Sequence, residues 1–351
     1  MKVLITGVTG QLGYDVAKEL ERRHIEYKGV GSKDMDLTVP AEVEKVVAAY
    51  HPDAVIHCAA YTAVDKAEDE YGRAMDVNAK GTLALAKAAK KIDAKMLYIS
   101  TDYVFKGQGT EAFAVDASTA PLNVYGLTKL FGEEAVQMEL MKYFIVRISW
   151  VFGKNGNNFI KTMLRLGQTH DKLTVVADQW GSPTYTADLA PLLCDMVETE
   201  KYGIYHATNE GITNWAEFAA AIMKEANFSC RIRPIPSSDY PTKAVRPLNS
   251  RMDKSSLDKA GFTRLPEWKD ALRRYLKEIG ALYGFRLWAV GSLFSSPESR
   301  APSPESPVPN LDSRLPGPRL DSRAPTLEHT PKVGISAGGR QPITNSLQLN
   351  I

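Results

Sequence analysis

A glycine-rich segment between a predicted buried strand and a predicted helix constrains the fold of this chain most strongly. Residues 2–6 form a short apolar, β-branched run, which is typical of a buried parallel strand. The run leads into Gly7, Gly10 and Gly13, and residues 14–20 then show helical spacing. Such a turn lets the backbone approach a pyrophosphate closely, and the helix N-terminus presents free N–H groups to the anion. A glycine loop that merely turns the chain is the alternative, but the strand–turn–helix context favours dinucleotide binding.

Strands and helices alternate through the rest of the N-terminal half. The sequence predicts further strands and intervening helices at residues 25–30, 41–50, 54–57, 71–91, 96–99, 125–141 and 143–148. This alternation predicts an α/β fold with a doubly wound parallel sheet. Ligands bind at the carboxyl ends of the strands in such sheets, and Thr101 follows one of these ends.

Tyr125 and Lys129 are four residues apart on a predicted helix, so their side chains share one face. An ammonium group beside a phenol lowers the phenol's pKa, which is about 10 in free tyrosine. With the Thr101 hydroxyl, the two side chains can protonate a ketone oxygen while a nicotinamide delivers hydride to the carbon. A solvated helix lysine is the alternative for Lys129, and the tyrosine one turn earlier favours the chemical role.

The composition is ordinary for a globular protein and excludes several functional classes. The chain has 351 residues, of which 44% are hydrophobic and 24% are charged, and its net charge of +2 gives no reason to expect a nucleic-acid or membrane partner. Cys58, Cys194 and Cys230 are scattered without metal-ligand spacing, which favours a reduced, cytoplasmic setting without a bound metal. We expect neither a signal peptide nor a membrane span, because a strand begins at residue 2 and no apolar run is long enough.

The C-terminal half changes character twice. After residue 150 the alternation loosens, although Asn214 and Glu217 predict a capped helix start and residues 268–283 a final amphipathic helix. We therefore expect a cofactor-binding domain over residues 1–150. Residues 151–284 are expected to form a smaller substrate lobe, with some segments returning to the sheet. Residues 285–351 are predicted to be a low-complexity, disordered tail, because half of the chain's 20 prolines follow residue 296.

Several motifs in combination resemble the dTDP-4-dehydrorhamnose reductases, a family of extended short-chain dehydrogenases/reductases. The resemblance extends from residue 1 to about residue 284. The motifs that carry it are Thr6–Gly13, Cys58–Glu68, Ser100–Phe105, Pro121–Lys129, Arg147–Val151, Gly156–Phe159 and Arg246–Arg251.

The resemblance implies a Rossmann domain and reduction of the 4-keto group of dTDP-4-dehydro-L-rhamnose to dTDP-L-rhamnose, a precursor of cell-surface polysaccharide. It implies that Tyr125 donates the proton, that Lys129 lowers the Tyr125 pKa and bonds the nicotinamide ribose, and that Thr101 bonds the keto oxygen. Asp102 and Trp150 match substrate-contacting positions. Besides Gly7 and Gly13 of the glycine motif, the cofactor-contacting positions are matched by Gly10, Gln11, Leu12, Asp36, Leu37, Ala60, Tyr61 and Thr62.

Three substrate assignments have structural alternatives. Trp150 follows a buried strand, so the alternative to substrate contact is packing in the core. For Asp102 the alternative is that its carboxylate bonds the backbone N–H groups of its own loop. Arg246 can bind the substrate diphosphate through its planar guanidinium or pair with a carboxylate, and we expect the phosphate contact.

The end of the second predicted strand favours NADPH over NADH. A carboxylate about 20 residues after the glycine motif binds the adenosine ribose in NAD-dependent enzymes. Here residues 29–33 read Gly-Val-Gly-Ser-Lys, and the first carboxylate is Asp34. A small residue and a lysine suit a 2′-phosphate, so we expect a preference for NADPH, with NADH also usable.

Two other functions remain open from the residues. A nucleotide-sugar epimerase or dehydratase shares the fold and the Tyr/Lys pair, but a dehydratase is expected to carry an Asp-Glu pair after the threonine, where Asp102-Tyr103 stands. A non-catalytic NADP-binding regulatory subunit does not need Thr101, Tyr125 and Lys129, all of which are intact. The nucleobase and the oligomeric state, a homodimer included, stay open. Some relatives use magnesium at a dimer interface, but the sequence has no carboxylate cluster that demands it.

Overall fold

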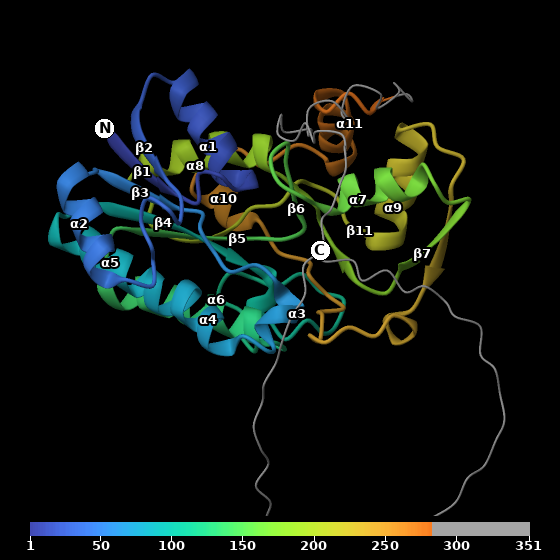
Figure 1. The fold of residues 1–351 in the computed structure, drawn as a ribbon, viewed down its shortest axis with the longest axis horizontal. Coiled ribbons are helices and arrows are strands. Elements are labelled where there is room, and N and C mark those ends of the chain that lie inside the picture. The colour runs from blue at the N-terminus through green and yellow to red at the C-terminus, as the bar shows by residue number, and fades with distance from the viewer. Residues whose placement is uncertain (283–351) are drawn as a thin grey trace, which may run out of the picture. The chain divides into compact units, whose positions relative to one another are not determined.

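The computed structural model describes residues 1–282, and within them a six-stranded parallel sheet forms the centre of the fold (Figure 1). Its order is β2-β1-β3-β4-β5-β10. The strands are β1 (Lys2–Thr6), β2 (Glu26–Val30), β3 (Ala54–His57), β4 (Lys95–Thr101), β5 (Tyr143–Ile148) and β10 (Gly203–His206). The predicted doubly wound parallel sheet is confirmed. The chain adds β2 on one side of β1 and β3 on the other, and ligands bind in such sheets at the point where the strand order reverses in this way.

Helices cover both faces of the sheet, because alternate strand residues point to opposite sides. Val3 and Ile5 of β1 pack in one core with α1 (Gln11–Arg22) and α8 (Thr186–Val197). Leu4 packs in the opposite core, where the covering helices are α2 (Pro40–Tyr50), α5 (Thr82–Lys91) and α6 (Val124–Glu139). Figure 1 shows the sheet between α1 and α8 above and α5 and α6 below. Burial on both faces explains the continuous apolar runs of the central strands.

The helix predicted over residues 71–91 contains a wider turn in its middle. It consists of α4 (Tyr71–Met75), a π-helical turn (Asp76–Gly81) and α5. Within the π turn, Asn78 donates to the Tyr61 carbonyl at 3.0 Å and accepts the Tyr61 N–H at 2.8 Å. The widened turn therefore anchors the loop after β3, a tertiary role that helical periodicity alone does not reveal.

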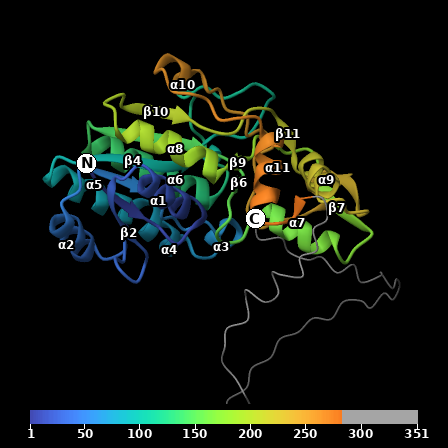
Figure 2. The same cartoon turned by 90° about the horizontal axis from the view of Figure 1, so that it is seen from above.

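A second lobe lies at one end of the sheet, where Figures 1 and 2 both show α7 and α9 near β7, with α11 in the same lobe. Its elements include α7 (Phe159–Gly167), β7 (Lys172–Val176), α9 (Trp215–Glu225), β12 (Arg231–Ile235) and α11 (Trp268–Glu278). Phe152, Phe218 and Tyr275 are among its buried aromatic residues. The predicted capped start of α9 is confirmed, since the Asn214 side chain accepts the Glu217 N–H at 2.9 Å.

Several segments beyond residue 150 return to the sheet. They include α8, which packs on α1, and β10, which pairs with β5, with α10 (Ser255–Lys259) beside it. Shorter elements complete the fold: α3 (Val64–Ala67), 3-10 turns at Asp102–Val104 and Ser237–Asp239, and the strand pairs β6 (Val151–Phe152) with β9 (Thr184–Tyr185) and β8 (Trp180–Gly181) with β11 (Thr213–Asn214). The predicted tail, residues 285–351, lies outside the described residues.

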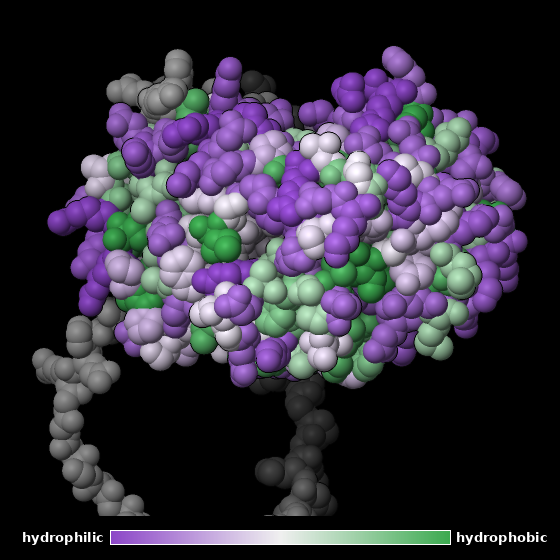
Figure 3. Space-filling model, turned by 180° about the vertical axis from the view of Figure 1, so that it is seen from behind, coloured by the Kyte–Doolittle hydropathy of each residue, from purple (hydrophilic) through white to green (hydrophobic). Residues whose placement is uncertain are grey.

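The surface seen from behind is hydrophilic in its upper part, and apolar residues are more frequent across the lower middle of the view (Figure 3). No helix within residues 1–282 combines the length and the apolar character needed to cross a bilayer.

Candidate active site

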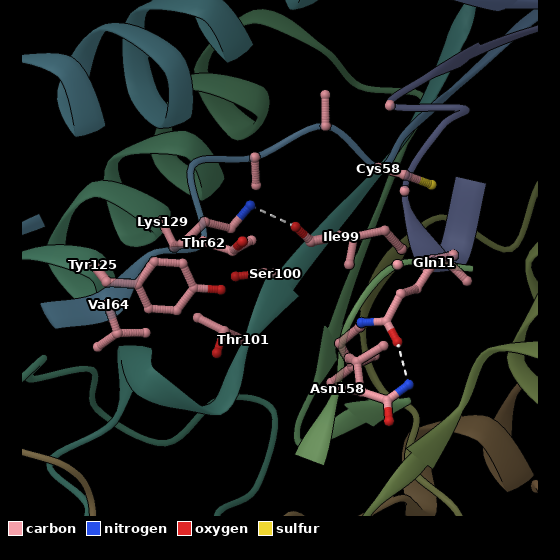
Figure 4. A pocket seen from close by; sticks show the side chains of 18 of the residues that line it. Gln11, Cys58, Thr62, Val64, Ile99, Ser100, Thr101, Tyr125, Lys129 and Asn158 are labelled. Atoms are coloured by element: carbon pink, nitrogen blue, oxygen red, sulfur yellow. Dashed lines mark hydrogen bonds between the residues drawn. The ribbon is translucent and has the colours of Figure 1, made fainter. Parts of the chain in front are cut away.

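The carboxyl ends of β1, β3, β4 and β5 open into a cavity of about 650 Å³, which the second lobe closes from the other side. Gly7, Cys58, Thr101 and Ile148 line it from the four strand ends, and Trp215 lines it from α9. Figure 4 shows side chains of both lobes facing this space. The cavity thus lies where a doubly wound sheet is expected to bind its ligand.

The glycine turn is shaped by close backbone packing. Gly7 has a φ of +67°, and a Cβ there would lie 2.8 Å from the Ala59 Cα. A Cβ on Gly13 would lie 2.3 Å from the Gly7 carbonyl oxygen, so Gly13 supports the turn from behind and does not line the cavity. Gly10, Gln11 and Leu12 line it at the start of α1, where the helix has no side-chain cap. These free N–H groups fit an anionic pyrophosphate.

Most of the other predicted cofactor positions lie along the same cavity. Asp36, Leu37, Ala60 and Thr62 line it, as do Gly31 and Ser32 after β2. Tyr61 is not among the lining residues, because its hydroxyl donates to Glu70 at 3.0 Å.

The three predicted catalytic side chains come from two adjacent elements. Thr101 is the last residue of β4, while Tyr125 and Lys129 occupy the first two turns of α6. Asn123 caps that helix by accepting the Gly126 N–H at 2.8 Å. All three side chains line the cavity, and Figure 4 shows Tyr125 and Lys129 reaching from α6 toward the end of β4.

The electrostatics of this group differ in one respect from the sequence-based expectation. Burial raises the pKa of Tyr125 above its usual value, and the neighbouring Thr101 side chain opposes this rise without cancelling it. Lys129 is not among the groups that shift the Tyr125 pKa here, and its Nζ donates to the Ile99 carbonyl at 2.7 Å (Figure 4). Burial lowers the pKa of Lys129 to about 7, against the favourable charge of Glu133.

Asp102 lies in the floor of the site with an exposure of 2%. Its carboxylate accepts hydrogen bonds from Thr101 Oγ1 at 3.0 Å and from Ser250 Oγ. Burial raises its pKa to about 6, although these hydrogen bonds favour the ionised form. Asp102 is thus placed to orient the Thr101 hydroxyl as well as to contact a substrate.

Trp150 and Trp215 form an aromatic wall of the cavity. Their rings stack with centroids 3.9 Å apart and planes 19° apart. Trp150 has a φ of +49°, an uncommon conformation for a bulky residue, and a Cβ on Gly181 would lie 3.1 Å from its ring. Trp150 therefore faces the ligand space and is not a plain core residue. The sequence analysis missed Trp215, because its local pattern indicates only the start of α9.

Arg246 pairs with a carboxylate, which is the alternative to the expected phosphate contact. Its guanidinium forms two hydrogen bonds with Asp65, at 3.0 and 2.7 Å, and it is not among the residues that line the cavity. The structure therefore does not bring Arg246 to the predicted substrate site, since the carboxylate of a segment distant in sequence already satisfies it.

Gln11 has a second role that the sequence analysis missed. Its Oε1 accepts the Gly153 N–H at 2.9 Å and Asn158 Nδ2 at 3.0 Å (Figure 4). Asn155 Nδ2 also donates to the Thr9 carbonyl at 2.7 Å. The glycine turn is thus tied to the segment that leads into α7. The Gly-Asn-Asn-Phe motif at residues 156–159 is the only local signal for this contact.

Within residues 1–282, no three His, Cys, Asp or Glu side chains gather as metal ligands would.

Comparisons with known proteins agree with this geometry. Residues 1–281 match the RmlD substrate binding domain family. The chain is 39% identical over 277 residues to the spore coat polysaccharide biosynthesis protein SpsK of Bacillus subtilis, covering 79% of this chain and 97% of that protein. It is 40% identical over 285 residues to a dTDP-4-dehydrorhamnose reductase of Aggregatibacter actinomycetemcomitans, with 78% and 97% covered.

A crystal structure of dTDP-4-dehydrorhamnose reductase from Bacillus anthracis in complex with NADP superposes with a TM-score of 0.77 at 42% identity, covering 79% of this chain and 99% of that one. The cavity, the strand order and these similarities agree, and the chain belongs to the dTDP-4-dehydrorhamnose reductase (RmlD) family.

Proposed function

We propose that this protein reduces the 4-keto group of dTDP-4-dehydro-L-rhamnose to dTDP-L-rhamnose with NADPH. The observation that carries the proposal is the meeting of Thr101, Tyr125 and Lys129 in the cavity that also contains the glycine turn. Family membership supports the same reaction. The product is a precursor of cell-surface polysaccharide, and we place the reaction in the cytoplasm, where scattered cysteines stay reduced.

The residues around the cavity fit a dinucleotide. The N-terminus of α1 with Gly10 and Gln11 would hold the pyrophosphate, and Gly31 and Ser32 leave room for a 2′-phosphate. When bound, the reduced nicotinamide supplies a hydride to the carbonyl carbon. No side chain within the described residues supplies such a hydride, so the protein's part is to bind, orient and protonate.

Tyr125 donates the proton to the oxygen that becomes negatively charged. Its raised pKa keeps it protonated at neutral pH, and transfer is favourable only as charge develops on the substrate oxygen. Thr101 has a single hydroxyl proton, which it donates to Asp102 in this structure. With substrate bound, the hydroxyl would turn and donate this proton to the substrate oxygen instead. The Lys129 ammonium would favour negative charge at this point and, with the cofactor bound, would hydrogen-bond the nicotinamide ribose. These groups stabilise the transition state more than they stabilise the ketone.

The test is NADPH oxidation with dTDP-4-dehydro-L-rhamnose, measured for the parent protein and for Tyr125→Phe. We expect the variant to bind NADPH normally and to lose about 10²–10⁴-fold in kcat, the usual contribution of a general acid. Near-normal turnover would remove Tyr125 from this role. Purified parent protein that carries stoichiometric NAD would instead favour an epimerase, and NADPH binding without turnover a regulatory subunit.

A homodimer and the division into residues 1–150, 151–284 and 285–351 remain predictions. The division is useful mainly for the chemistry, since cofactor groups come from the first part and the aromatic wall is completed by Trp215 of the second.

A further inference from the structure

Glu133 is a buried carboxylate directly behind the candidate catalytic side chains. It lies one turn after Lys129 on α6, and its side chain is 1% exposed. Its oxygens accept hydrogen bonds from Ser100 Oγ at 2.5 Å and from Arg147 Nε and Nη2 at 2.8 and 2.7 Å. It does not line the cavity, so it touches neither ligand directly.

These hydrogen bonds join the two elements that carry the site. Ser100 immediately precedes Thr101 on β4, and Glu133 shares α6 with Tyr125. Arg147 lies opposite Ser100 on β5. Two further contacts hold the Arg147 side chain in place. Its Nη1 donates to the Val115 carbonyl at 2.9 Å, and its guanidinium lies 4.9 Å from the centroid of the Phe105 ring. The network therefore holds α6 in register with the end of β4.

Glu133 also supplies charge beside the Lys129 ammonium. Tyr125, which shares a face of α6 with that ammonium, stays protonated because burial raises its pKa. In the described part of the chain, the other titratable groups around the ammonium are Tyr98 on β4, His57 on β3 and Cys58 after it. All three are neutral near pH 7, since burial raises the pKa of Tyr98 well above 10, raises that of Cys58 to about 12 and lowers that of His57 to about 3. The carboxylate of Glu133 is thus what favours a charged Lys129.

Arg147 and Ser100 give the buried side chain of Glu133 its polar partners. A carboxylate at this depth needs such partners, because burial removes the water that would otherwise solvate it. The two-pronged contact with Arg147 and the hydrogen bond from Ser100 replace the lost water.

We propose that Glu133 is a positioning residue of the active site, whose carboxylate, anchored by Arg147 and Ser100, keeps Lys129 charged and fixes α6 against β4. The inference rests on the proposed function, because it assigns Glu133 a part in that same reaction. It predicts an effect on pH dependence that loss of packing alone would not produce.

The experiment compares Glu133→Gln, which removes the charge, with Glu133→Asp, which keeps it. For each variant, kcat for NADPH oxidation and the affinity for NADPH, from the quenching or enhancement of its fluorescence, are measured between pH 6 and 10. Both kcat and NADPH affinity should decline at high pH as Lys129 loses its proton. In Glu133→Gln we expect this decline to begin about one pH unit lower or more, with about tenfold lower kcat at pH 8. In Glu133→Asp the decline, called the alkaline limb below, should begin at the same pH as in the parent.

Two further variants separate this effect from instability. Glu133→Gln leaves Arg147 buried without its partner, so its melting temperature should fall. Adding Arg147→Gln removes the second charge and should restore much of that temperature while the shifted limb remains. Asp188→Asn is the matched control. Asp188 accepts two hydrogen bonds from the Arg274 guanidinium, at 2.5 and 2.7 Å, and neither residue lines the cavity. This variant should lower the melting temperature without moving the limb.

Profiles of Glu133→Gln and of the double variant that coincide with the parent's would overturn the proposal. An equal shift in Glu133→Asp would also overturn it, because the effect would then come from geometry and not from charge. Failure of the proposed function is distinguishable: a parent protein without turnover contradicts that function, while the NADPH titrations still test Glu133.

Discussion

Burial acts on Tyr125 and Lys129 in opposite directions. It raises the pKa of the phenol and lowers that of the ammonium to about 7, because the charged form of each loses solvation. A phenol that keeps its proton until negative charge develops on the substrate suits reduction better than one that ionises beforehand. The four-residue spacing predicts the pairing, but the direction of the Tyr125 shift depends on side chains from other elements.

Asp102 is predicted to reduce the stability of the folded protein at neutral pH. Its pKa is raised from 3.8 to about 6, so the folded state binds the proton more readily than the unfolded state does. Stability therefore falls as the pH rises from about 4 to about 6, and the full cost, about 3 kcal/mol, applies above that range.

Asp102→Asn removes this cost and should raise the free energy of unfolding in urea at pH 7 by about 1–3 kcal/mol while slowing turnover. Asp258→Asn should gain nothing, because Arg264 holds the pKa of that carboxyl below its usual range. An Asp102→Asn protein less stable than the parent at pH 7 would contradict the prediction.

Ser32 is predicted to set the cofactor preference. It lines the cavity just after β2, where a carboxylate would repel a 2′-phosphate and bond a ribose diol. Ser32→Asp should therefore lower the ratio of kcat/KM for NADPH to that for NADH by about tenfold or more. An unchanged ratio would place the 2′-phosphate elsewhere.

At the scale of single elements, the glycine turn and α1 act as one packed unit. Gly13→Ala would place a methyl group 2.3 Å from the Gly7 carbonyl oxygen, and backbone cannot move aside cheaply. We expect weaker NADPH binding and a loss of about 1–3 kcal/mol in stability, measured by fluorescence titration and urea unfolding. Gly72→Ala on α4 is the control, because nothing lies within 4 Å of its added Cβ. It should be neutral or stabilising, and equal behaviour of the two variants would contradict the packing argument.

Element positions follow from periodicity, but their ends depend on contacts. The strand predicted over residues 96–99 extends to Lys95–Thr101, because pairing with β5 continues to Thr101. The final helix, predicted over residues 268–283, ends at Glu278. The π turn at Asp76–Gly81 is also set by tertiary contacts, since it holds the loop that contains Tyr61.

At the scale of the whole molecule, the residues within 1–282 that line the cavity lie between Thr6 and Phe218, and α11 completes the core of the second lobe by Glu278. We therefore expect a protein ending at residue 284 to keep the parent's NADPH affinity, with kcat/KM within about twofold, since it retains every one of these lining groups. Loss of folding or of turnover in this shortened protein would show that residues 285–351 contribute to the active unit.

The sequence by itself determined the parallel α/β sheet, the glycine turn and the catalytic spacing on α6, because each depends on residues close together in the chain. Only the tertiary structure decided that Arg246 pairs with Asp65, that Trp215 stacks on Trp150 and that burial raises the Tyr125 pKa. Such pairings depend on which distant segments the packed lobes bring together, and desolvation depends on everything packed around a group, so local patterns carry no record of either.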